Sequence, residues 1–179
     1  MIEEAELALE AGRQPLCEIV GYGNANDPDP TIPGGGYPVA MRRALESAGL
    51  GVGDIDAIFA WGPGHPILDR AEASALEQVF GKKLSEIPTT SIKGVIGNPL
   101  AGAGPLQVAA AAFSLVEGIV PPTANHEVPL PGIQLDIVTG EALRSRPETI
   151  LLNAHGIGGA NCSLILKRWS VESIPTYAQ

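Results

Sequence analysis

The sequence predicts a layered α/β fold with a mixed β-sheet and one buried helix. Segments with helical periodicity alternate with short β-type runs along the first part of the chain. Three β-type runs then follow one another near the end, which is typical of strands joined without helices. Between these parts lies a helical segment that is apolar on nearly every side, which indicates that it packs on both of its sides.

The individual elements follow from periodicity and from the residues that end them. Helices are expected at residues 3–11, 38–48 and 67–80, and each is followed by a glycine, a common residue after a helix C-terminus. Strands are expected at residues 16–22, 55–60, 87–92, 133–138, 149–154 and 161–167. The glycine- and proline-rich segments 23–36 and 61–66 are predicted to be loops.

The apolar helix is expected at residues 106–116, after a glycine-rich turn at 94–104. Four alanines in a row, Ala109 to Ala112, would let other backbones approach it closely. A helix that covers one face of a sheet has a polar outer side, whereas a helix that is apolar on all sides must be covered on both sides. The chain is therefore expected to supply only half of a larger layered sandwich.

The charge balance excludes several partners. The 179 residues include 11 Lys and Arg against 20 Asp and Glu, a net charge of −9, so neither nucleic acid nor an anionic membrane surface is an expected partner. The longest apolar run, 108–116, is shorter than the roughly 18 residues that span a bilayer. A secretory signal begins with a positively charged region, whereas this sequence has the acidic residues Glu3, Glu4 and Glu6 near its start. We therefore expect a cytoplasmic protein.

The cysteines and histidines form no metal or cofactor motif. Cys17 and Cys162 lie in β-type runs and are predicted to be buried thiols rather than a disulfide. His65, His126 and His155 lack metal-ligand spacing, and the sequence contains neither a P-loop nor a G-x-S-x-G motif. We therefore expect no metal and no cofactor.

Four motifs in order resemble one known family. They are Asp69 to Ala73 with Val79 to Gly81, Lys93 with Gly97 and Ala101 to Gly104, Gly118 to Thr123, and Gly156 to Asn161. The sequence resembles the C-terminal half of the β-ketoacyl-acyl-carrier-protein synthases, the condensing enzymes of fatty-acid and polyketide synthesis. The resemblance implies the C-terminal half of a thiolase-like layered αβαβα fold, with a mixed five-stranded sheet and one buried helix. Residues 1–24 would lead in from an N-terminal half, 25–168 form the ketosynthase domain and 169–179 a tail.

The resemblance also locates the usual catalytic groups. The family's nucleophilic cysteine belongs to the N-terminal half, so neither Cys17 nor Cys162 stands in its place. Aligning on the motifs puts Trp61 and Asn98 where the family has its two catalytic histidines. Neither usual histidine is therefore present, and no catalytic residue is assigned with certainty.

Three residues remain candidates for catalysis: Asn98, His155 and His65. Asn98 would donate a hydrogen bond to a thioester carbonyl. His155 matches the family's phenylalanine that gates the acyl pocket, whose backbone N–H forms one side of the oxyanion hole; alternatively it is only a loop or pocket-wall residue. His65 would take the first histidine's role if its loop is built differently. The implied substrate-binding residues are His155, Ile157, Gly158 and Asn98.

A charged cluster is implied by the same comparison. Lys93 matches the family lysine beneath the active site, and carboxylates on the helix that carries Asp69 and Glu72 would hold it. Gln107 replaces a family glutamate on the buried helix, which favours a structural role for the cluster.

Three functions stay open. The first is a non-catalytic subunit similar to a chain-length factor, which completes the fold and acyl pocket of a condensing enzyme. The second is half of an active acyl-transferring synthase whose nucleophilic cysteine is on a partner chain, and the third is an acyl-binding scaffold. The expected partners are an N-terminal ketosynthase half or active ketosynthase subunit and an acyl carrier protein, in a hetero-oligomer.

Overall fold

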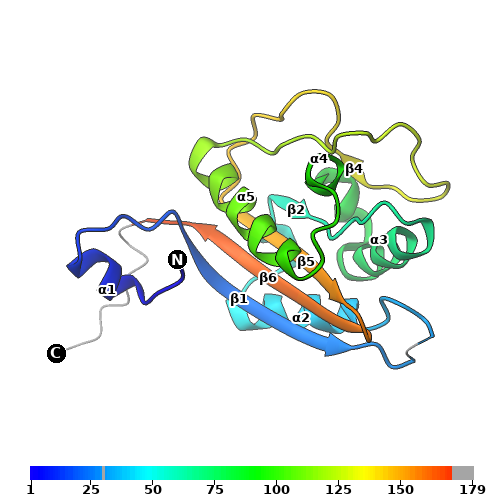
Figure 1. The fold of residues 1–179 in the computed structure, drawn as a ribbon, viewed down its shortest axis with the longest axis horizontal. Coiled ribbons are helices and arrows are strands. Elements are labelled where there is room, and N and C mark those ends of the chain that lie inside the picture. Colours follow the sequence, from blue (N-terminus) through cyan, green and yellow to red (C-terminus); the bar gives the residue numbers. More distant parts are fainter. Residues whose placement is uncertain (30, 171–179) are drawn as a thin grey trace.

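The computed structural model describes residues 1–29 and 31–170, so the expected tail lies outside the described residues from residue 171 onward. A single mixed sheet forms the centre of the fold, with the strand order β1-β6-β5-β2-β3-β4 (Figure 1). Its strands are β1 (Cys17–Asn26), β2 (Ala57–Phe59), β3 (Pro88–Thr90), β4 (Asp136–Ile137), β5 (Thr149–Gly156) and β6 (Ala160–Arg168). The described part of the sheet thus has six strands, which matches the six β-type segments of the sequence and exceeds by one the five-stranded sheet that the resemblance implied.

Pairing directions divide the sheet into two halves. β1, β6 and β5 are antiparallel neighbours, whereas β5, β2, β3 and β4 run parallel. Helices connect β2 to β3 and β3 to β4, because a parallel neighbour is reached only through a crossover connection. The alternation predicted from the first part of the sequence therefore supplies β2 and β3 of the parallel half, and the late strand run supplies β4, β5 and β6.

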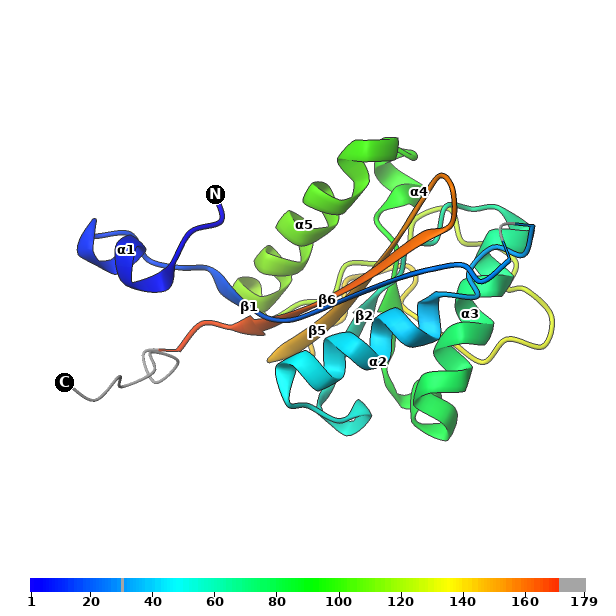
Figure 2. The same ribbon diagram turned by 90° about the horizontal axis from the view of Figure 1, so that it is seen from below.

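Each face of the sheet carries its own core, because neighbouring residues of a strand point to opposite faces. Ile58, Leu151 and Ile165 pack with α2 (Tyr37–Ala48) and α3 (Pro66–Phe80). Residues Phe59, Leu152 and Leu166 pack on the opposite side, against α5 (Ala103–Glu117). Figure 2 shows the sheet edge-on, with α2 and α3 on one side and α5 on the other.

The helix α5 is buried on one side only. Ala111 and Leu115 are fully buried against the sheet. The opposite side carries Leu106, Phe113 and Val116, whose exposed fractions are 46%, 58% and 45%. The predicted helix is confirmed, but within the described residues it is buried on its sheet side only, and its outer side has no covering layer.

By length and composition alone, the segment Leu100–Glu117 meets the criteria for a membrane-spanning helix, which the shorter apolar run 108–116 did not indicate. Its packing is that of a core helix, because Ala103, Gln107 and Ser114 are buried toward the sheet together with its apolar residues. The apolar composition of this segment is typical of a helix that packs against other structure on both of its sides.

Two segments differ from the prediction. Strand β1 continues to Asn26, although Gly23 was expected to begin a loop, because residues 23–26 pair with β6. The predicted glycine-rich turn contains the short helix α4 (Lys93–Ile96) and a 3-10 turn (Leu100–Gly102). A short helix α1 (Ala5–Glu10) and the 3-10 turns Val52–Asp54 and Gly81–Glu86 complete the described elements.

Candidate functional site

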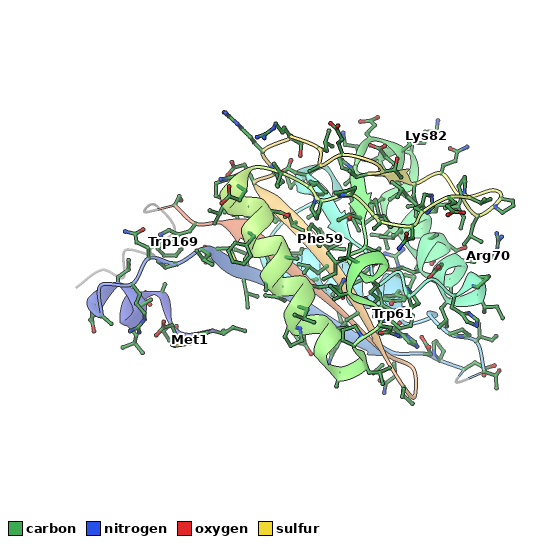
Figure 3. All side chains as sticks on the ribbon, turned by 45° about the horizontal axis from the view of Figure 1, so that its top comes forward. Met1, Phe59, Trp61, Arg70, Lys82 and Trp169 are labelled. Carbon is green, nitrogen blue, oxygen red and sulfur yellow. The ribbon has the colours of Figure 1, made fainter. Side chains whose placement is uncertain are left out.

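The candidate site lies at the end of the sheet where β2 and β5 reach their carboxyl termini, a common place for ligands in α/β folds. Trp61 follows β2, and His155 lies near the end of β5. Their rings are 5.1 Å apart between centroids and inclined at 51°. The Tyr37 ring of α2 lies 5.8 Å from the His155 ring. Figure 3 shows Trp61 at this end of the sheet, beyond the buried Phe59.

Glu72 of α3 fixes the backbone that carries Trp61. Its carboxylate accepts hydrogen bonds from the backbone N–H groups of Trp61 and Gly62, both at 2.9 Å, and from Asn153 Nδ2 at 3.2 Å. The side chain is buried, and this burial raises the pKa of the carboxyl group despite the three donors. Glu72 therefore serves to hold the turn after β2.

Lys93 is buried at the start of α4, and its Nζ lies over the Trp61 ring, 5.9 Å from the ring centroid. Its ammonium group donates to the backbone carbonyl of Trp61 and lies 3.4 Å from Gln107 Oε1. The carboxylates of Glu72 and Asp69 act on it electrostatically, while desolvation, the larger effect, lowers the pKa of the amine. The ammonium is thus held directly by a carbonyl and an amide oxygen, not by a close ion pair with the carboxylates.

Gln107 connects the two neighbouring strands β2 and β5 to α5. Its Nε2 donates toward the backbone carbonyls of Ala60 at 3.0 Å and of Phe59 and Asn153 at 3.3 Å each. Its Oε1 faces Lys93, so one amide joins the ammonium to the ends of β2 and β5. Sequence reasoning identified Gln107 only as a replacement for a glutamate and missed this junction.

His155 is held by Asn161 of β6. His155 Nδ1 lies 3.0 Å from Asn161 Oδ1, and Asn161 Nδ2 lies 2.7 Å from Asp27 Oδ1. Asp27 in turn accepts hydrogen bonds from the backbone N–H groups of Gly34 and Gly36 at 3.0 and 2.8 Å. The motif around His155 signalled this loop in the sequence, but nothing there signalled Asp27.

The other candidate residues lie on exposed segments. Asn98 is exposed between α4 and the following 3-10 turn, where its Oδ1 accepts a 3.4 Å hydrogen bond from Leu100 N. Ile157 and Gly158 form the exposed turn between β5 and β6. In Figures 1 and 2 this turn and the segment joining α4 to α5 lie at the same end of the sheet. His65 lies at the exposed N-cap of α3.

A cavity of about 800 Å³ lies on the α3 side of the sheet. Lys93, Glu72 and Asp69 form its polar wall, and the segment 123–139 covers it. Neither Trp61 nor His155 lines it, so it is separate from the paired rings.

The cysteine thiols and the arrangement of possible metal ligands describe the chemistry available at the site. Both cysteines are free, and burial raises the pKa of the Cys17 and Cys162 thiols, which disfavours the nucleophilic thiolate. Within residues 1–29 and 31–170, no group of three or more His, Cys, Asp or Glu side chains is arranged to hold a metal ion. The site instead offers hydrogen-bonding groups and aromatic surface.

The family follows from comparison with known proteins. Residues 16–127 match the C-terminal domain of beta-ketoacyl synthase. The chain belongs to this family. The expected thiolase-like fold is confirmed by solved ketosynthase structures: the ishigamide ketosynthase/chain length factor has a TM-score of 0.88 and 31% identity over 94% of this chain and 42% of that chain. A beta-ketoacyl synthase from Burkholderia phymatum has a TM-score of 0.87, also at 31% identity, over 94% and 41% of the two chains.

Curated relatives of this ketosynthase domain act in both polyketide and fatty-acid synthesis. The tetracenomycin polyketide synthase ketoacyl synthase beta subunit of Streptomyces glaucescens is 40% identical over 92% of this chain and 41% of its own length. The actinorhodin polyketide putative beta-ketoacyl synthase 2 of Streptomyces coelicolor is 37% identical over 95% of this chain and 42% of its own length. The 3-oxoacyl-[acyl-carrier-protein] synthase 2 of Coxiella burnetii is 32% identical over 94% of this chain and 42% of its own length. The ketosynthase domain therefore spans about two fifths of the length of these relatives.

Proposed function

We propose that this domain is part of a non-catalytic, chain-length-factor-like partner in a polyketide-type condensing complex. The observation that carries the proposal is that Trp61 and Asn98 occupy the positions where the resemblance places the two catalytic histidines. Neither an indole nor an amide takes up a proton near neutral pH, so neither replaces histidine in proton transfer. The buried network beneath Trp61 then maintains the fold.

Two further observations support this function. The two polyketide relatives are 37% and 40% identical, against 32% for the Coxiella fatty-acid synthase. A solved relative is described as a ketosynthase/chain length factor. In the proposal, this domain completes the fold with an N-terminal ketosynthase half, pairs with an active ketosynthase subunit and shapes a pocket for acyl chains carried by an acyl carrier protein in the cytoplasm.

One specific observation favours a second function, half of an active acyl-transferring synthase. His155 stands 5.1 Å from Trp61 between ring centroids, so an imidazole is present beside the position of a missing histidine. Asn98 would then donate to the thioester carbonyl, while the nucleophilic cysteine comes from the N-terminal half.

Substitution of the candidate groups separates the two functions. The domain is assembled with the N-terminal ketosynthase half and an active ketosynthase subunit, and condensation of acyl carrier-bound substrates is measured. For a non-catalytic partner, Asn98→Ala and His155→Phe leave the condensation rate within about threefold. A catalytic role of His155 predicts a loss of about a hundredfold or more, the lower range of a general acid–base contribution.

The matched control is His126→Ala, a change in a histidine of the segment 123–139 that covers the separate cavity. It is expected to leave both rate and product length unchanged. A hundredfold loss with His155→Phe, together with an intact control, would replace the first function by the second. Failure of the domain to assemble with either partner would contradict both.

A further inference from the structure

The side chain of Asn161 has only one orientation that satisfies its surroundings. One of its two terminal atoms faces Asp27 Oδ1 at 2.7 Å, the Gly159 carbonyl at 3.0 Å and the Ala25 carbonyl at 3.3 Å. All three groups are acceptors, so this atom is the NH₂ nitrogen. The other terminal atom is therefore the carbonyl oxygen, and it faces His155.

This orientation determines where the His155 ring carries its proton. Asn161 Oδ1 accepts and cannot donate, and it lies 3.0 Å from His155 Nδ1. Nδ1 must therefore carry a hydrogen for the contact to be a hydrogen bond. In the neutral ring, Nε2 then has no hydrogen and presents a lone pair.

The arrangement is rigid on its supporting side and open on the other. Asp27, which orients Asn161, is bound by two backbone N–H groups, and the His155 ring packs near both the Trp61 ring and the Tyr37 ring. Within the described ranges 1–29 and 31–170, no residue forms a hydrogen bond with His155 Nε2, and the residue is partly exposed at the carboxyl end of β5. The lone pair is thus available to a ligand.

We propose that His155 Nε2 is a fixed hydrogen-bond acceptor that selects acyl chains bearing a hydroxyl or enol O–H. This inference rests on the proposed function, which brings acyl thioesters to this end of the sheet. A keto oxygen or a saturated carbon offers no hydrogen to Nε2, whereas a hydroxyl or enol does. Asn161 acts through His155 and is a positioning residue.

The tautomer is tested without any activity. The assembled protein is labelled with ¹⁵N-histidine, and the imidazole nitrogens are identified by their couplings to the ring protons in NMR spectra, with His155 assigned by its loss in His155→Gln. We expect hydrogen on Nδ1 and none on Nε2. Asn161→Leu removes the acceptor and is expected to change this pattern, while the signals of His65 and His126 stay as internal controls. Hydrogen on Nε2 in the unmodified protein overturns the inference.

Ligand selection is tested by binding two acyl carrier-bound chains of equal length, one saturated and one with a hydroxyl group. One hydrogen bond makes the hydroxylated chain bind roughly three- to tenfold more tightly. His155→Phe is expected to abolish this preference and to retain binding of the saturated chain, whereas His126→Phe keeps the preference. Equal binding by the unmodified protein, or a preference that survives His155→Phe, overturns the inference alone. Binding of neither chain overturns the proposed acyl pocket as well.

Discussion

Glu72 shows how much of the site depends on one buried carboxylate. Its two oxygens face only donors, the N–H groups of Trp61 and Gly62 and the amide of Asn153. In Glu72→Gln, the NH₂ group of the new amide would face one of these N–H donors, and the hydrogen bond at that position would be lost. We expect a loss of about 1–3 kcal/mol in the free energy of unfolding, measured by urea denaturation at low protein concentration.

Glu77→Gln is the matched control, because Glu77 lies on the same helix and is exposed. It is expected to change the free energy of unfolding by less than about 0.5 kcal/mol. Equal effects of the two substitutions would show that Glu72 does not hold the turn after β2.

Asp27 gives a prediction about pH. Desolvation raises the pKa of its carboxyl group, but hydrogen bonds from Gly36 N, Asn161 and Gly34 N, together with the electrostatic effect of His155, outweigh it, so the net pKa is lowered from 3.8. A carboxyl whose pKa is lower in the folded state stabilises the fold above its unfolded pKa, and this stabilisation is lost as pH falls through the folded pKa. The stability difference between the unmodified chain and Asp27→Asn should therefore be largest near pH 6 and shrink below about pH 4.

The measurement is urea unfolding of both proteins across this range. A difference that is constant with pH would mean that the Asp27 carboxylate contributes no charge-dependent stabilisation to the loop. Asp54→Asn provides the control at an exposed position, because Asp54 caps a 3-10 turn remote from His155.

The site could be predicted from sequence only in part. The motifs located Trp61, Lys93 and His155, because each lies at a fixed spacing from a recognisable turn or helix. The bonds of Gln107 to Phe59, Ala60 and Asn153 join residues 46 to 48 positions apart in the chain. No local pattern encodes such contacts, since they arise only when α5 packs on the sheet.

At the scale of elements, helices were predicted well because their apolar spacing matches one buried face. Strand β1 was predicted too short because Gly23 was interpreted as the first residue of a loop, whereas the strand continues to Asn26. In the fold Gly21 and Gly23 allow close approach of α2: a Cβ atom at Gly23 would lie 2.0 Å from the Ala40 carbonyl oxygen, and one at Gly21 2.4 Å from that of Ala44. Glycine in this segment therefore allows a helix to pack closely on the strand and does not mark a loop.

This close approach predicts that Gly23→Ala is strongly destabilising. The new methyl group would meet backbone atoms of α2, which cannot rotate away as a side chain can. We expect a loss of about 1–3 kcal/mol or more, the range of overpacked cores, in urea unfolding. Gly53→Ala is the control, because a Cβ there meets nothing within 4 Å. A Gly23→Ala protein as stable as the control would show that α2 and β1 are farther apart than described.

At the scale of the whole molecule, one side of α5 determines how the domain behaves alone. Leu106, Phe113 and Val116 are about half exposed, and beside them a groove of about 410 Å³ is lined by apolar residues of α4 and α5, including Val95 and Ile96. Proteins that are stable monomers rarely expose contiguous apolar patches beyond a few hundred Å². The ketosynthase domain without an N-terminal half is therefore expected to self-associate at micromolar concentration.

A charge in the centre of this surface should prevent the self-association. Phe113→Lys is expected to shift the isolated domain toward monomer in analytical ultracentrifugation, and to weaken its assembly with an N-terminal ketosynthase half, because the same side of α5 would be desolvated in both complexes. Val39→Lys is the matched control, since Val39 is an exposed apolar residue of α2 on the opposite face of the sheet, with 42% of its surface accessible. A monodisperse unmodified domain, or equal effects of the two lysines, would show that the outer side of α5 does not need a covering layer.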